Sequence, residues 1–186
     1  MFFRKSCISK APNGQQYWFN HAIRAEIEKS ENTSESHMYG IVNAILARQF
    51  PVQDLYITRP QNRASFLGGG HGYSDFHTIH YVDDETRCFL ITQCKATGYE
   101  NRDSVWLQAQ RQLRDYLGTE HATRDQGERS PAYGMVVNGL GVRFFRYDDD
   151  NQEIKRLSPR ALDNWWHLKR DHALIQQRLN YIRNNH

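Results

Sequence analysis

Apolar residues recur at three- and four-residue steps in several segments of the chain, and this spacing predicts amphipathic helices. The predicted helices cover residues 15–29, 35–49, 103–117 and about 160–185. The second has the most regular apolar stripe, formed by Met38, Ile41, Val42, Ile45 and Leu46. Capping residues within 30–36 precede this helix and Pro51 follows it, so both of its ends are predicted as well as its buried face.

Short β-prone segments lie between these helices. They cover residues 54–58, 72–82, 87–96, 132–139 and 141–150. A polar turn at 83–85 predicts a hairpin between the second and third of these strands, and an Asn-Gly pair at 138–139 predicts a tight turn between the last two. The resulting order, α-α-β-β-β-α-β-β-α, predicts an α/β fold with a central mixed sheet flanked by helices.

Composition narrows the class of protein. The 186 residues are 39% hydrophobic and 24% charged, which suits one folded domain with a real core. A net charge of +3 permits binding to a polyanion without indicating it. The three cysteines, Cys7, Cys88 and Cys94, lack zinc-site spacing and predict reduced thiols in an intracellular protein. No apolar run is long enough to predict a signal peptide or a membrane span.

The strongest chemical signal lies on the predicted hairpin. Asp75 falls within its first strand, and Gln93 and Lys95 lie two residues apart on its second. Residues two apart in a strand share a face, so these two side chains point together while Cys94 points away. An acid, an amide and a lysine in one pocket suit phosphodiester hydrolysis, which needs a divalent cation, an activated water and a positive charge near the phosphate.

The run GYSD followed by FLITQCKA resembles the PD-(D/E)xK nuclease superfamily, and its QxK variant resembles Mrr-type restriction enzymes. Gln112 to Tyr116 on the next helix is similar to the QxxxY pattern of RecB-type nucleases. The resemblance implies a restriction-endonuclease-like αβββαβ core over about 35–147. It also implies a single nuclease-like domain over 1–186, with an N-terminal helix at 15–29 and a C-terminal helical extension at 160–185.

The resemblance also implies roles for individual residues. Asp75 would be the main ligand of Mg²⁺ or Mn²⁺, with Gln93, the Cys94 carbonyl and Glu35 completing or supporting the metal shell. Lys95 would position the attacking water and stabilise negative charge. Contacts with the DNA backbone would come from Gln112, Tyr116, Arg111 and Arg114.

Two features of this assignment depart from the family pattern or leave a choice open. Gln93 stands where the family usually has an acid, which removes a negative charge and should weaken metal binding. Glu35 is the preferred helix acid because it lies at helical spacing from the buried positions of 35–49, with Glu26 and Glu28 as alternates.

Several other residues have competing interpretations. His77 shares a face with Asp75 and is a further candidate for contact with the nucleic acid. Zinc binding by His71, His77 and His80 is not expected, because the last two point to opposite faces of one strand. The acids at 83–85 are expected to be a solvated turn. The tryptophans and basic residues after 164 are expected to combine packing with a solvated helical face.

We therefore expect a metal-dependent nuclease that hydrolyses DNA through metal-activated water, with RNA as an open alternative substrate. Duplex cleavage by small domains of this superfamily commonly uses two active sites, so the resemblance also implies a homodimer. The competing hypothesis is a catalytically inactive nuclease-fold module that binds nucleic acid or a protein partner.

Overall fold

A computed structural model describes residues 16–30, 33–65, 71–82, 85–122, 131–157 and 165–186. Its helices are α1 (His21–Lys29), α2 (Glu35–Gln49), α3 (Asp103–Ala122) and α4 (His172–Asn184), with short 3₁₀ turns η2 (Tyr17–Phe19) and η3 (Val52–Asp54). Its strands are β1 (Tyr56–Ser65), β2 (His71–Val82), β3 (Glu85–Lys95), β4 (Tyr133–Asn138), β5 (Gly141–Asp148), β6 (Glu153–Arg156) and β7 (Trp166–His167).

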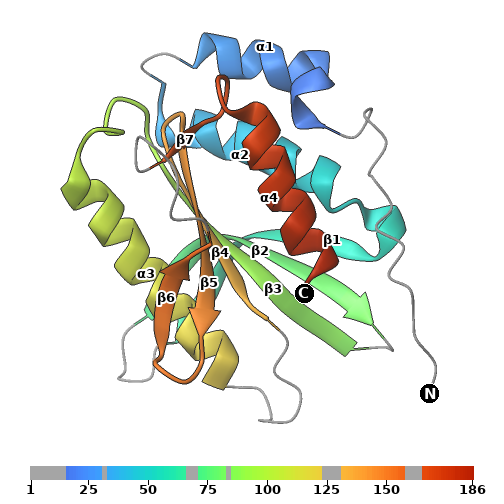
Figure 1. The fold of residues 1–186 in the computed structure, drawn as a ribbon, viewed down its shortest axis with the longest axis vertical. Helices are drawn as coiled ribbons and strands as arrows, with labels where there is room; N and C mark the ends of the chain where they lie inside the picture. Colours follow the sequence, from blue (N-terminus) through green and yellow to red (C-terminus); the bar gives the residue numbers. More distant parts are fainter. Residues whose placement is uncertain (1–15, 31–32, 66–70, 83–84, 123–130, 158–164) are drawn as a thin grey trace.

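One mixed sheet contains all seven of these strands (Figure 1). Its order is β1-β2-β3-β4-β5-β6, with β7 added alongside β5. Neighbouring strands are antiparallel except β3 and β4, which are parallel and are joined through α3. This arrangement confirms the predicted α/β fold with a central mixed sheet.

Helices cover both faces of the sheet (Figure 1). On one face, α1, α2 and α4 enclose a core that includes Leu90 and Cys94 of β3. On the other face, α3 packs through Trp106 and Leu113 onto a second core that includes Ile91. Since alternate residues of β3 enter opposite cores, Gln93 and Lys95 belong to the face that α3 covers, as the two-residue spacing predicts.

The first predicted helix is wrong at its start. Asn20 has an extended backbone, with φ −79° and ψ 116°, and its side chain accepts a hydrogen bond from Ile23 N. It therefore caps a helix that begins at His21, while the residues before it form the separate turn η2. An Asn side chain readily accepts a hydrogen bond from a free N–H group in the first turn of a helix, so it favours a helix start at its own position. The apolar spacing continues back to Trp18, but the cap at Asn20 determines where the helix begins.

The segment after Pro159 is not helical throughout, so that prediction also needs correction. Residues 158–164 lie outside the described residues, but Trp166 and His167 form β7 against Val142 and Gly141 of β5. Trp166 is 8% exposed and its ring packs beside Phe144 of β5. Its ring is therefore buried where it pairs with the sheet. The helix that follows covers only His172–Asn184.

The ends of other predicted elements also differ in the structure. The strand predicted at 54–58 starts at Tyr56 and runs to Ser65, with Pro60 within it. Proline is tolerated there because β1 lies at the edge of the sheet. α3 runs five residues past Leu117, the predicted end of this helix, and β6 was not predicted. Among the described helices, none has the length and apolar character to cross a membrane.

His80 of β2 and His186 at the C-terminal end of the chain lie against each other, and their partly buried rings predict a pH-dependent stability. His186 Nε2 lies 3.2 Å from His80 Nδ1, and His186 stacks on Phe89 with ring centroids 4.0 Å apart. Burial lowers the pKa of both imidazoles, and Arg87 beside His80 and Arg183 beside His186 lower it further, despite opposing backbone hydrogen bonds. A base with a lowered folded-state pKa stabilises the fold above its ordinary pKa, and this stabilisation is lost as the pH falls.

We therefore expect the free energy of unfolding to decrease as the pH falls below about 6.5, the ordinary pKa of histidine. Urea denaturation between pH 7.5 and 5 measures this slope. His80→Gln should reduce it, whereas His21→Gln on the exposed start of α1 should leave it unchanged. An equal slope in wild type and His80→Gln would show that the pair does not control it.

Candidate active site

The Asp75 carboxylate lies where β2 and β3 separate. The two strands pair from Val82 and Glu85 as far as Phe76 and Thr92. Immediately beyond this point, Asp75 Oδ2 accepts a hydrogen bond of 2.5 Å from the backbone N–H of Cys94. The carboxylate thus bonds an N–H group of β3 beyond the last backbone pair of the two strands, and Asp75 as a residue is only 7% exposed.

The Cys94 backbone directs both of its polar groups to the β2 side of the strand, and its N–H bonds the Asp75 carboxylate. The Lys95 carbonyl accepts from Gly139 N, on the β4 side of the strand. Successive residues of a strand direct their N–H and C=O groups to opposite edges, so the Cys94 carbonyl is directed to the β2 side, like its N–H.

Helix α2 supplies the second carboxylate. The Tyr39 hydroxyl donates to Asp75 Oδ1, and it also lies 3.5 Å from Glu35 Oε1. The Ser34 side chain caps the helix by accepting from His37 N, which sets the start of α2 just before Glu35. The structure therefore brings together Glu35 and Asp75, which are 40 positions apart in the sequence, around one hydroxyl group.

Sequence reasoning missed Tyr39. The available signal was its position, four residues after Glu35 and so on the same side of the helix. Its ring also packs edge-on against Phe76, with centroids 5.5 Å apart. This contact explains how a residue of α2 reaches the end of the β2–β3 pairing.

Gln93 and Lys95 border the site on the α3 face. Gln93 is 2% exposed, and its Nε2 has no hydrogen-bond partner within the described part of the chain. Lys95 is partly buried, and its positive charge lowers the pKa of Asp75. The Asp75 carboxylate on β2 and the Lys95 side chain on β3 are therefore close enough to interact electrostatically.

The electrostatics of the site favour a positive charge. Desolvation raises the pKa of Asp75, and the hydrogen bonds from Cys94 N and Tyr39 and the charge of Lys95 only partly offset it. Desolvation also raises the pKa of the Tyr39 hydroxyl and of the Cys94 thiol, and both carboxylates add to each effect. A cation bound beside the carboxylates would offset the cost of burying their negative charge.

Helix α3 carries the residues predicted to contact DNA. Tyr116 is 2% exposed, and burial together with Asp75 and Asp115 raises its pKa to about 12, so it lies on the sheet side near the site. Gln112 is partly buried, and its Oε1 has no partner within the described residues. Arg111 and Arg114 are exposed, and Arg114 forms an ion pair of 2.9 Å with Asp115.

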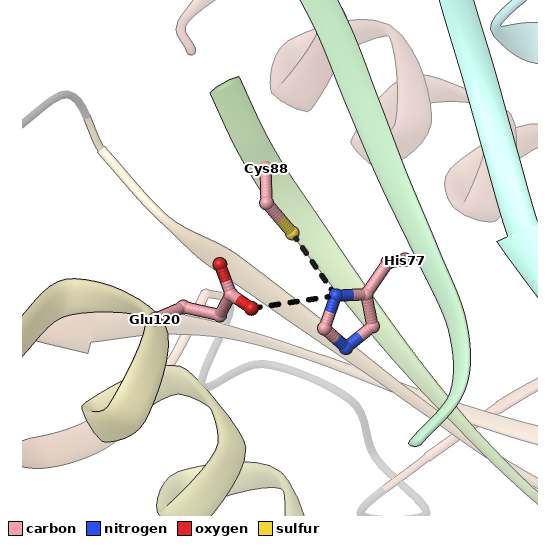
Figure 2. A group of neighbouring side chains, drawn as sticks. All are labelled: His77, Cys88 and Glu120. Atoms are coloured by element: carbon pink, nitrogen blue, oxygen red, sulfur yellow. Dashed lines mark hydrogen bonds and ion pairs between the residues drawn. The ribbon is translucent and has the colours of Figure 1, made fainter. Parts of the chain in front are cut away.

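The remaining candidate site residues, Glu26, Glu28 and His77, form contacts with residues outside the Asp75 site. Glu26 and Glu28 are exposed on α1, where they pair with Lys29 and Arg24. His77 is 1% exposed, and its Nδ1 lies 3.6 Å from both Cys88 Sγ and Glu120 Oε1 (Figure 2). Burial and nearby Arg59 lower its pKa to about 4, so the ring is neutral at pH 7 and does not form an ion pair with Glu120.

Searches against protein-family models, curated proteins and solved structures found no match to this chain. The candidate site is therefore judged from its own residues and geometry.

Proposed function

We propose that this protein is a metal-dependent nuclease that hydrolyses phosphodiester bonds of DNA. One observation carries the proposal. The carboxylates of Asp75 and Glu35 converge on the Tyr39 hydroxyl, beside Lys95, at the point where two strands separate. A buried acid with a raised pKa next to a lysine, without a packing role for either charge, is typical of a functional site.

The donor atoms suit Mg²⁺ or Mn²⁺. Two carboxylates and a backbone carbonyl are hard oxygen ligands, and such ions keep waters in their remaining positions. The Cys94 thiol is fully buried in the core that α1, α2 and α4 enclose, on the other side of β3 from Gln93 and Lys95. A bound ion would neutralise charge on the phosphate and acidify a water molecule.

The protein's own residues supply the other requirements. Lys95 holds a positive charge beside Asp75, where it can orient the attacking water and stabilise the phosphorane oxygens. Tyr39 and the Cys94 N–H fix the Asp75 carboxylate by one hydrogen bond to each oxygen. The exposed Arg111 and Arg114 are placed on the helix that borders the site, where they can contact backbone phosphates.

A supercoiled plasmid incubated with purified protein tests this proposal. We expect nicking or linearisation with Mg²⁺ or Mn²⁺ and none with EDTA. Asp75→Asn should reduce the rate by about 100-fold or more, because it removes the charged ligand that defines the site. Asn retains an acceptor for the Cys94 N–H, so the fold should persist. Asp150→Asn, in the exposed turn after β5, is the matched control.

The same experiment distinguishes the alternative. Retention of plasmid on the protein, without metal-dependent cleavage, would favour a nuclease-fold module that only binds nucleic acid. Gln93 in place of an acid is the feature that motivates this alternative, because it leaves two carboxylates to hold the ion. A single-stranded RNA substrate in parallel reactions separates deoxyribonuclease from ribonuclease activity.

A further inference from the structure

A second group of potential metal ligands lies on the same face of the sheet. His77 of β2, Cys88 of β3 and Glu120 of α3 direct one atom each toward a shared space (Figure 2). Their ligand atoms all lie within 4.8 Å of one another. These residues come from three elements, and neither the catalytic motif nor the roles proposed above for Asp75 and Lys95 involve this space.

Two of the three separations fit tetrahedral metal coordination, and one of them is too long for a hydrogen bond. His77 Nδ1 lies 3.6 Å from Cys88 Sγ and 3.6 Å from Glu120 Oε1. A nitrogen-to-oxygen hydrogen bond spans about 2.7–3.2 Å, so the second contact is too long for one. Tetrahedral zinc with ordinary bond lengths separates nitrogen from sulfur by about 3.6 Å and nitrogen from oxygen by about 3.4 Å.

The chemistry of the three groups selects the kind of ion. Imidazole and thiolate ligands favour zinc and similar transition metals, whereas Mg²⁺ prefers oxygen ligands alone. An imidazole binds such an ion through the lone pair of one ring nitrogen, and Nδ1 is the nitrogen of His77 that faces Cys88 and Glu120 (Figure 2). The side chain of Glu120 is 28% exposed, so it can move by the small distance that closer coordination requires.

We propose that His77, Cys88 and Glu120 bind a zinc-class divalent cation through one nitrogen, one sulfur and one oxygen atom. The ion displaces the proton of the Cys88 thiol, which passes to solvent, and a water molecule completes four-coordination. The bound ion joins the end of α3 to the β2–β3 hairpin. It therefore also holds in place the helix that carries Gln112 and Tyr116.

Cobalt binding tests the site directly, because Co²⁺ replaces Zn²⁺ and its spectrum reports the ligands. The full chain, freed of metal with chelator, is titrated with Co²⁺ under reducing conditions. We expect one equivalent to produce a thiolate-to-cobalt charge-transfer band with visible bands typical of tetrahedral coordination, and Zn²⁺ to abolish both. Zn²⁺ should also raise the melting temperature of the wild-type protein, since it binds only the folded state.

Substitutions test whether Cys88, and not another cysteine, supplies the thiolate that binds the ion. Cys88→Ser should abolish the charge-transfer band and the shift in melting temperature, whereas Cys7→Ser should leave both intact. Glu120→Gln should retain the fold, because its side chain is partly exposed, and should weaken cobalt binding by at least about 10-fold. An unchanged spectrum in Cys88→Ser, or no charge-transfer band in the wild type, would overturn the proposal.

The test is independent of nuclease activity. Asp75→Asn should bind Co²⁺ with the same charge-transfer band, because the carboxylate of Asp75 is not among the three ligands. Loss of that band in Asp75→Asn would contradict the proposal, because Co²⁺ binding to the thiolate would then depend on the Asp75 carboxylate.

Discussion

Replacing Lys95 with alanine is expected to reduce the rate of DNA cleavage by about 100- to 1,000-fold, the usual cost of removing a group that stabilises transition-state charge. The expectation follows from the position of Lys95 at the end of β3, where its charge lowers the pKa of Asp75. The side chain is only partly buried, so its removal leaves no large cavity. Single-turnover cleavage of a fluorescent duplex at saturating Mg²⁺ or Mn²⁺ measures the loss.

Two comparisons make this result specific. Lys29→Ala removes an equally charged side chain from the exposed end of α1, where it pairs with Glu26 at 3.4 Å, and should leave the rate unchanged. Far-ultraviolet circular dichroism and the melting temperature should be the same for Lys95→Ala and wild type. Full activity in a cleanly purified Lys95→Ala protein would remove the proposed role of this residue and, with it, the main support for the nuclease proposal.

Gly134→Ala is expected to destabilise the fold, even though the added group is a single methyl. A Cβ at this position of β4 would lie 2.4 Å from Leu113 Cδ2 and 2.9 Å from Leu113 Cγ. Leu113 is fully buried between α3 and the sheet, so it has no free space to enter. Overpacking of this kind costs about 1–3 kcal/mol, and the lower backbone entropy of alanine in the unfolded chain offsets about 0.5–1 kcal/mol of it.

The net decrease in the free energy of unfolding should therefore be up to about 2.5 kcal/mol, which corresponds to at most roughly 5–10 °C in melting temperature for a chain of this size. Gly40→Ala is the matched control. Its Cβ would meet nothing within 4 Å in the middle of α2, so it should stabilise the protein by up to about 1 kcal/mol.

A double-mutant cycle identifies the cause. Leu113→Ala removes the atoms that the new methyl would meet, so Gly134→Ala should cost less in that background than in the wild type. Equal costs in the two backgrounds would show that Leu113 is not the obstacle. Chemical denaturation of the four proteins provides the required free energies.

The local pattern of the chain is sufficient to predict much of the fold. The stripe from Met38 to Leu46 predicts α2 with both its ends, because apolar spacing, a serine cap and Pro51 all agree. The alternating segments around Asp75 and Lys95 predict the β2–β3 hairpin correctly for the same reason. The start of α1 was wrong because Asn20 caps a later turn, a choice between two local signals that periodicity does not decide.

Long-range pairing is what the sequence does not determine. Trp166 belongs to a strand because Val142 of β5 offers it a partner and a buried place beside Phe144, and nothing adjacent in the chain indicates that partner. The extension of β1 past Thr58 likewise depends on pairing with β2. Tertiary contacts override the weak local preferences of such segments.

The same distinction between local sequence pattern and long-range contact applies to the candidate site. The sequence alone determined which residues of β2 and β3 share a face, because the two-residue period of a strand is a local property. Only the tertiary structure decided that Tyr39 binds Asp75 and that Glu35 reaches the same hydroxyl, since both contacts depend on how α2 packs on the sheet. The grouping of His77, Cys88 and Glu120 was decided in the same way, because it requires three elements to meet and no spacing along the chain encodes their distance.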